Sequence, residues 1–137
     1  MDIRIIVLII LGVEPKVPHI LLVEDDRDHL TLFTMVLKAA GYTVDALSDS
    51  ASALSKFKPN SYDLVIMDYR MPELNGYDLY RRIKEKAQET KVLIITATHE
   101  QIISNDGEEL QNQKNVRIMR KPVSNEDLLD EVKSILN

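Results

Sequence analysis

The chain has 137 residues, the size of one ordinary domain, and 45% of them are hydrophobic, which is enough apolar mass for a sizeable core. Its 17 basic and 22 acidic residues give a formal net charge of −5, and no lysine- or arginine-rich block provides the footprint that direct nucleic-acid binding needs. The lack of cysteine excludes a disulfide framework and a thiolate metal site, and it fits a cytoplasmic location.

Residues 1–17 contain a dense apolar run, 5–11, ahead of the first expected strand. The run is too short for a membrane span, which takes about 20 apolar residues, and it lacks the basic start and cleavage site of a secretory signal. The run could be an added strand or helix that covers an apolar patch. Its β-branched residues and the break at Gly12, Pro15 and Pro18 favour an extended segment, which could self-associate through edge pairing if it stays exposed. We expect residues 1–17 to be an extension and residues 18–137 to be the domain.

From residue 18 onward, short apolar runs alternate with longer amphipathic ones, which is typical of a βα repeat with a parallel sheet. The third and fourth runs are almost continuously apolar, and this favours central strands that are buried on both faces. The expected strands are residues 19–23, 43–47, 64–67, 92–96 and 116–119.

Four amphipathic segments are expected to form helices. The first ends at Gly41, a good C-terminal cap, and the last begins after Ser124 with a pattern close to a capping box. Between residues 99 and 115 apolar residues are sparse, so a further helix there would be short or poorly packed. The four expected helices span roughly residues 30–40, 50–57, 76–86 and 124–135.

Acidic side chains follow two of the expected strands at the point where each strand ends. Glu24, Asp25 and Asp26 come after the first strand, and Asp68 comes at the end of the third. Because the carboxyl ends of parallel strands meet at one edge, these carboxylates can converge on one hard cation. Mg²⁺ characteristically takes one or two carboxylates together with phosphate oxygens. An acidic triplet alone is more often a solvated loop, and it is Asp68 that favours a cation site.

Thr96 and Lys121 come at the ends of the fourth and fifth strands. Taken alone, the threonine is more often a simple strand residue and the lysine a solvent-exposed strand end. Beside clustered carboxylates, however, the lysine would balance charge and bind a phosphate oxygen, and the threonine hydroxyl could contact the same oxyanion. The combined set predicts a site that holds Mg²⁺ and a phosphoryl group.

Four runs in this order strongly resemble the receiver domain of two-component response regulators. The runs are residues 20–26, 63–72 with Gly76, 92–97 and 120–122, and the resemblance covers about residues 18–137. It implies an α/β fold of the flavodoxin-like kind, a three-layer sandwich whose five-stranded parallel sheet has the order 2-1-3-4-5 and helices on both faces. It also implies a phosphorelay signalling domain rather than an enzyme.

The resemblance implies a role for each matched residue. Asp68 would accept a phosphoryl group from a histidine kinase or a histidine phosphotransfer protein. Asp25 would be the main Mg²⁺ ligand beside Asp68, Glu24 would act through water, and the backbone carbonyl of Arg70 would complete the protein ligands. Phosphorylation would change a surface that a downstream protein reads.

The resemblance also assigns Thr96 and Lys121 to the phosphoryl oxygens. One departure concerns the output: Ile118 stands where receivers commonly have a switch aromatic, three residues before the lysine. This departure mildly favours an alternative, a receiver-like adaptor that acts without phosphorylation. A second alternative is an aspartate-nucleophile phosphatase, which usually has another aspartate where this chain has Arg70. Homodimer formation stays open.

Overall fold

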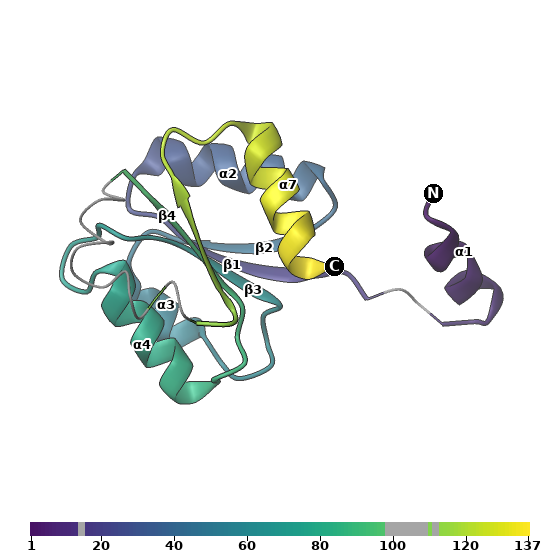
Figure 1. The fold of residues 1–137 in the computed structure, drawn as a ribbon, viewed down its shortest axis with the longest axis horizontal. Coiled ribbons are helices and arrows are strands. Elements are labelled where there is room, and N and C mark those ends of the chain that lie inside the picture. Colours follow the sequence, from purple (N-terminus) through teal and green to yellow (C-terminus); the bar gives the residue numbers. More distant parts are fainter. Residues whose placement is uncertain (14–15, 98–109, 111–112) are drawn as a thin grey trace.

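The computed structural model describes residues 1–13, 16–97, 110 and 113–137. Its sheet has five parallel strands in the order β2-β1-β3-β4-β5, as the resemblance implied, with helices on both faces (Figure 1). The strands are β1 (His19–Val23), β2 (Thr43–Leu47), β3 (Leu64–Asp68), β4 (Val92–Thr96) and β5 (Val116–Arg120). The described helices are α1 (Ile3–Ile10), α2 (Arg27–Ala39), α3 (Ser50–Lys56), α4 (Gly76–Lys86) and α7 (Asn125–Leu136).

The middle of the sheet is buried on both faces because its strands are apolar at almost every position. Every residue of β3 and of β4 is buried, which confirms the interpretation of the continuous apolar runs as central strands. Successive residues of β1 belong to different layers. Leu21 and Val23 pack with α3 and α4, whereas Ile20 and Leu22 pack with α2 and α7 (Figure 1).

The helices that flank the sheet begin at side chains that accept hydrogen bonds from the first turn. Asp26 caps α2, and α2 therefore starts at Arg27, a few residues before the apolar spacing predicts. The other caps are Asp49, Asn75 and Ser124. The predicted helices otherwise agree closely with the observed bounds, and the stretch 99–115, where a weak helix is expected, lies mostly outside the described residues.

The prediction of an extended N-terminal segment is wrong, because residues 3–10 form the helix α1. Asp2 caps this helix and accepts a hydrogen bond from the backbone N–H of Arg4 at 2.7 Å. A strand needs a neighbouring strand for its backbone groups, whereas a helix satisfies them within the segment. Since none of the described strands pairs with this segment, the helix satisfies backbone groups that an isolated strand would leave to water. No described helix is both long and apolar enough to cross a membrane.

Gly76, the first residue of α4, lies directly against the end of β3. Its N–H donates a hydrogen bond to the carbonyl oxygen of Tyr69 at 2.7 Å. A Cβ atom at position 76 would overlap the carbonyl oxygen of Asp68 and would lie 2.7 Å from the Cα of Tyr69. The loop after β3 can therefore close onto α4 only because this residue has no side chain.

We expect Gly76→Ala to lower the free energy of unfolding by about 2 kcal/mol or more, because backbone atoms cannot move aside for the added methyl group. The measurement is chemical denaturation followed by circular dichroism. Gly41→Ala is the matched control: Gly41 has a positive φ of 100° but no atom near a Cβ position, so backbone strain alone should cost about 1 kcal/mol. An equal or smaller loss for Gly76→Ala would contradict the steric explanation.

Candidate functional site

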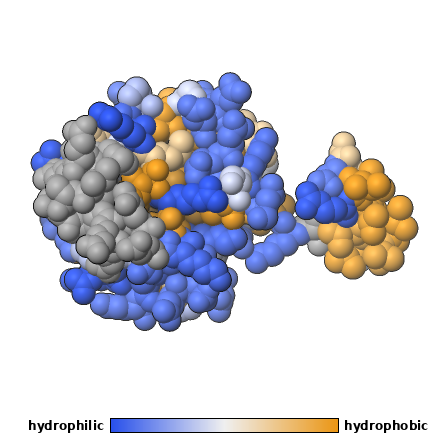
Figure 2. All heavy atoms as spheres, in the orientation of Figure 1, coloured by the Kyte–Doolittle hydropathy of each residue, from blue (hydrophilic) through white to orange (hydrophobic). Residues whose placement is uncertain are grey.

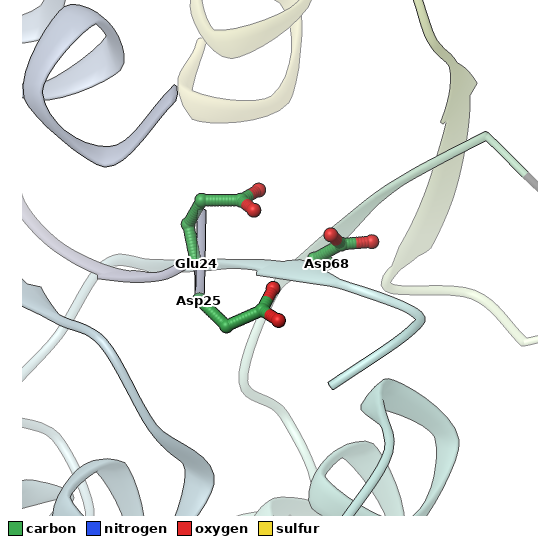
Figure 3. A group of neighbouring side chains, drawn as sticks. All are labelled: Glu24, Asp25 and Asp68. Carbon is green, nitrogen blue, oxygen red and sulfur yellow. The ribbon is translucent and has the colours of Figure 1, made fainter. Parts of the chain in front are cut away.

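Three carboxylates meet at the carboxyl edge of the sheet. Oxygen atoms of Glu24, Asp25 and Asp68 lie within 4.8 Å of one another, and Figure 3 shows them between the ends of β1 and β3. These two strands are neighbours, with Val23 in register with Met67, so the residues that follow them must be close. Glu24 and Asp68 are buried, whereas Asp25 is exposed. The structure therefore brings together the acidic residues that the strand ends predict.

Lys121 reaches this cluster from the end of β5, which lies on the opposite side of β3 from β1 in the strand order. Its Nζ lies 3.1 Å from Oδ2 of Asp68 and 3.2 Å from Oε2 of Glu24. The backbone N–H of Lys121 donates to the carbonyl oxygen of Thr96 at 2.8 Å, which extends the pairing of β4 and β5 by one residue. The side chain is only 14% exposed, so the ammonium group is held among acidic partners rather than in solvent. The solvent-exposed alternative for Lys121 does not hold.

Arg70 and Thr96 also lie at this edge. The backbone N–H of Arg70 donates to Oδ1 of Asp68 at 3.2 Å, while the Arg70 side chain is exposed. Thr96 is fully buried at the end of β4, one residue beyond Ile95, which is in register with Asp68. Asp26 belongs to the helix start instead, since its side chain accepts hydrogen bonds from the first turn of α2.

Burial and mutual repulsion dominate the electrostatics of the cluster. Burial, followed by the negative charge of Asp68, raises the pKa of Glu24 from 4.5 to about 7, although Lys121 opposes this shift. Burial works to lower the pKa of Lys121, but the charges of Asp68 and Glu24 outweigh it and the pKa is raised. One ammonium therefore does not offset all the negative charge, and the oxygen-rich donor set fits a hard divalent cation.

His29 is a site residue that the sequence interpretation missed. It lies in the first turn of α2, and its Nδ1 is 3.4 Å from Nζ of Lys121. Its backbone N–H donates to the Asp26 cap at 3.0 Å. The available signal was its position three residues after a capping aspartate, which places it in the first helical turn beside the strand end.

The fold and this acidic cluster are those of a receiver-type domain. Residues 20–133 match the model of the response regulator receiver domain. The chain is 30% identical over 118 residues to the response regulator receiver protein CpdR of Brucella abortus. This match covers 86% of the present chain and 96% of CpdR. The chain therefore belongs to the response regulator receiver domain family, whose members accept phosphoryl groups from histidine kinases and are not enzymes of the ordinary kind. The chain covers 36% of the length of each of two other matched relatives.

Solved structures agree with this assignment. A CheY-like receiver domain protein from Methanospirillum hungatei matches with a TM-score of 0.78 and 26% identity, over 88% of this chain and 94% of that one. The receiver domain of the sensor histidine kinase PA1611 from Pseudomonas aeruginosa matches with a TM-score of 0.72 and 25% identity, over 88% and 98% of the two chains. That structure has a magnesium ion coordinated in its active site cleft. The acidic cluster of this chain is consistent with a receiver Mg²⁺ site.

We expect Glu24→Gln to become more stable relative to the parent as the pH rises from about 4.5 to about 7 in EDTA. In this window the unfolded parent has lost the Glu24 proton and the folded parent still holds it, so the parent loses stability with rising pH. The difference in free energy of unfolding should grow by on the order of 1–3 kcal/mol and level off above about pH 7. Denaturation at several pH values measures it.

Asp26→Asn is the control for this experiment. The hydrogen bond from the His29 backbone lowers the pKa of Asp26 below its usual 3.8, so the charged cap stabilises the parent above that pH. The Asp26→Asn variant should therefore show no change relative to the parent between pH 4.5 and 7, and it should gain stability relative to the parent only as the pH falls below about 3.8. A Glu24→Gln difference that does not vary with pH would show that Glu24 titrates normally.

Proposed function

We propose that this chain accepts a phosphoryl group on Asp68 from a histidine kinase or a histidine phosphotransfer protein and signals through a changed protein-binding surface. The observation that carries the proposal is the position of Asp68, whose carboxylate lies 3.1 Å from the Lys121 ammonium and beside two further carboxylates. Membership of the receiver family supports the same reaction. We infer that a downstream protein, rather than nucleic acid, reads the change, because the chain has a net charge of −5.

We assign Asp25, Asp68 and the backbone carbonyl of Arg70 as the direct Mg²⁺ ligands. Asp25 is exposed and is therefore available to a hydrated ion. Glu24 has both oxygens engaged, one by the Asp26 N–H at 3.1 Å and the other by Lys121 at 3.2 Å, which supports a role through water. When bound, the ion supplies positive charge against the phosphoryl oxygens and the Asp68 carboxylate.

The proposed transfer is an in-line displacement at phosphorus. One carboxylate oxygen of Asp68 forms the new bond to phosphorus, and the bond between phosphorus and the donor breaks with its electron pair going to the donor. The Arg70 N–H and the Lys121 ammonium each contact one Asp68 oxygen, so the carboxylate is oriented before the donor arrives. Lys121 then offsets charge on the phosphoryl group, and the hydroxyl of Thr96 from the adjacent strand holds one of its oxygens.

An adaptor that acts without phosphorylation is the second candidate. Ile118 favours it, because this aliphatic residue packs partly buried against the core layer of α3 and α4 and replaces the expected switch aromatic. The phosphatase alternative is weaker: Arg70 stands where the second aspartate of such enzymes would be, and its side chain is exposed.

We expect intact mass spectrometry to show a single phosphoryl gain after incubation with a small-molecule phosphodonor and Mg²⁺. The gain should disappear in Asp68→Asn and in EDTA, because one removes the nucleophile and the other removes the cation. Asp130→Asn is the matched control, an exposed carboxylate of α7 away from the cluster, and it should be phosphorylated like the parent. Persistence of the gain in Asp68→Asn would contradict the assignment. If neither a small donor nor kinase transfer modifies the parent, the adaptor is the better proposal.

We also propose that residues 1–17 are an extension to a receiver domain formed by residues 18–137, in a cytoplasmic protein. No residue of α1 is buried, and Figure 2 shows its apolar side chains gathered on the surface. Large apolar side chains this exposed favour self-association, and we infer that any homodimer of the chain uses this segment.

Removal of residues 1–17 should leave the free energy of unfolding within about 0.5 kcal/mol of the full chain, because the segment contributes no buried residue from α1. The mass in solution, measured by light scattering over a range of concentrations, should fall to that of a monomer if the full chain associates. A dimer that survives the truncation would place the interface on the receiver domain, and a large loss of stability would show that the segment belongs to the fold.

A further inference from the structure

We propose that His29 is a positioning residue for phosphorylation, because its neutral imidazole ring accepts the third hydrogen bond of the Lys121 ammonium. The inference rests on the function proposed above and names a residue that the receiver resemblance does not assign. The contact joins α2 to the residue that follows β5, across 92 positions of sequence, so it ties two layers of the fold together at the site.

The geometry around Lys121 accounts for all three of its N–H groups. Nζ lies 3.1 Å from Oδ2 of Asp68, 3.2 Å from Oε2 of Glu24 and 3.4 Å from Nδ1 of His29. An ammonium group has three donors and no lone pair, so each contact requires an acceptor on the other side. Two acceptors are carboxylate oxygens, and His29 supplies the only neutral one of the three.

The chemistry of the ammonium group also determines the form of the ring. Nδ1 can accept from Lys121 only with a free lone pair, so the proton of the neutral ring must be on Nε2. The Asp26 carboxylate lies 4.0 Å from Nδ1, and it accepts hydrogen bonds from the backbone N–H groups of Asp28 and His29. Lys121 is therefore the closer partner of Nδ1.

Two features hold the ring in place. It stacks on Phe33 one helical turn later, with the ring centroids 5.7 Å apart and the planes inclined by 12°. Phe33 is itself buried in the core between α2 and the sheet. In addition, the Asp26 cap fixes the first turn of α2, from which the ring projects. A ring supported in this way can hold Nζ between Glu24 and Asp68 at little cost in side-chain entropy.

The consequence concerns how well Lys121 is placed when the phosphodonor arrives. Glu24 and Asp68 both attract the ammonium, and both change their environment once a cation and a phosphoryl group enter the cluster. His29 is outside the group of carboxylates, so its contact can persist while Lys121 shifts toward a phosphoryl oxygen. Without this acceptor, one N–H of Lys121 turns to water and the ammonium is less well ordered for transfer.

The experiment compares His29→Leu with His29→Asn in the full chain. Leucine fills the space beside Phe33 but cannot accept a hydrogen bond, whereas the amide oxygen of asparagine can occupy the place of Nδ1. Met35→Ala, an exposed site on the same helix, is the control. The first readout is the hydrogen exchange of the Lys121 ammonium by nuclear magnetic resonance without phosphodonor. The second is the rate of phosphorylation by a small donor at saturating Mg²⁺, measured by intact mass.

We expect His29→Leu to speed the exchange of the Lys121 ammonium and to slow phosphorylation about fivefold, the factor that corresponds to one net hydrogen bond. His29→Asn should restore both values to within about twofold of the parent, and Met35→Ala should change neither. Equal effects of His29→Leu and His29→Asn on the ammonium exchange and on the phosphorylation rate would show that His29 acts only by packing, and this result would overturn the inference. If the parent is phosphorylated and His29→Leu matches it, only this inference fails; if the parent cannot be phosphorylated by any donor, both proposals fail.

Discussion

The competition of two buried carboxylates for one ammonium group is the interaction on which this site depends. Glu24 and Asp68 are buried and repel each other, and the Nζ of Lys121 lies 3.2 Å from Glu24 and 3.1 Å from Asp68. Its charge does not fully offset theirs, as the raised pKa of Glu24 shows. Such a cluster is costly unless a further cation joins Lys121 in it, and the fold must therefore be stable enough to hold the carboxylates together.

That stability comes from a sheet that is covered on both faces. Every position of β3 and β4 is buried, and alternate residues of the central strands belong to the two core layers. Because all neighbouring strands are parallel, their carboxyl ends meet at one edge, and the loop after each strand begins there. At the same edge two backbone segments approach each other closely, because Gly76 packs against the backbone of Asp68. The polar side chains that follow the buried strands are therefore gathered at the carboxyl edge of the sheet, where solvent can reach them.

The strand ends explain which parts of this structure a sequence can predict. The near-continuous apolar runs identify the central strands, and charged residues directly after them, such as Asp68 and Lys121, must then lie at the edge of the sheet. His29 escapes this logic because it is on a helix, and its approach to Lys121 depends on how α2 packs. The helix at residues 3–10 was also not predicted, because a short β-branched apolar run favours a strand. Only the fold shows that this run has no neighbouring strand, among those described, with which to pair.

Strand β5 connects Lys121 of the acidic cluster to both core layers of the molecule. Lys121 follows this strand directly, and the next residues lead to Ser124, which caps α7. Ile118 packs into the layer of α3 and α4, whereas Met119 packs into the layer of α2 and α7, so neighbouring residues of one strand contact both layers. An aliphatic side chain at position 118 has no ring to exchange between inward and outward positions.

A change at Lys121 that reaches the surface through β5 must therefore move the backbone of the strand or repack aliphatic side chains in both layers. A close-packed core resists such repacking by small increments, which favours two discrete arrangements over a graded response.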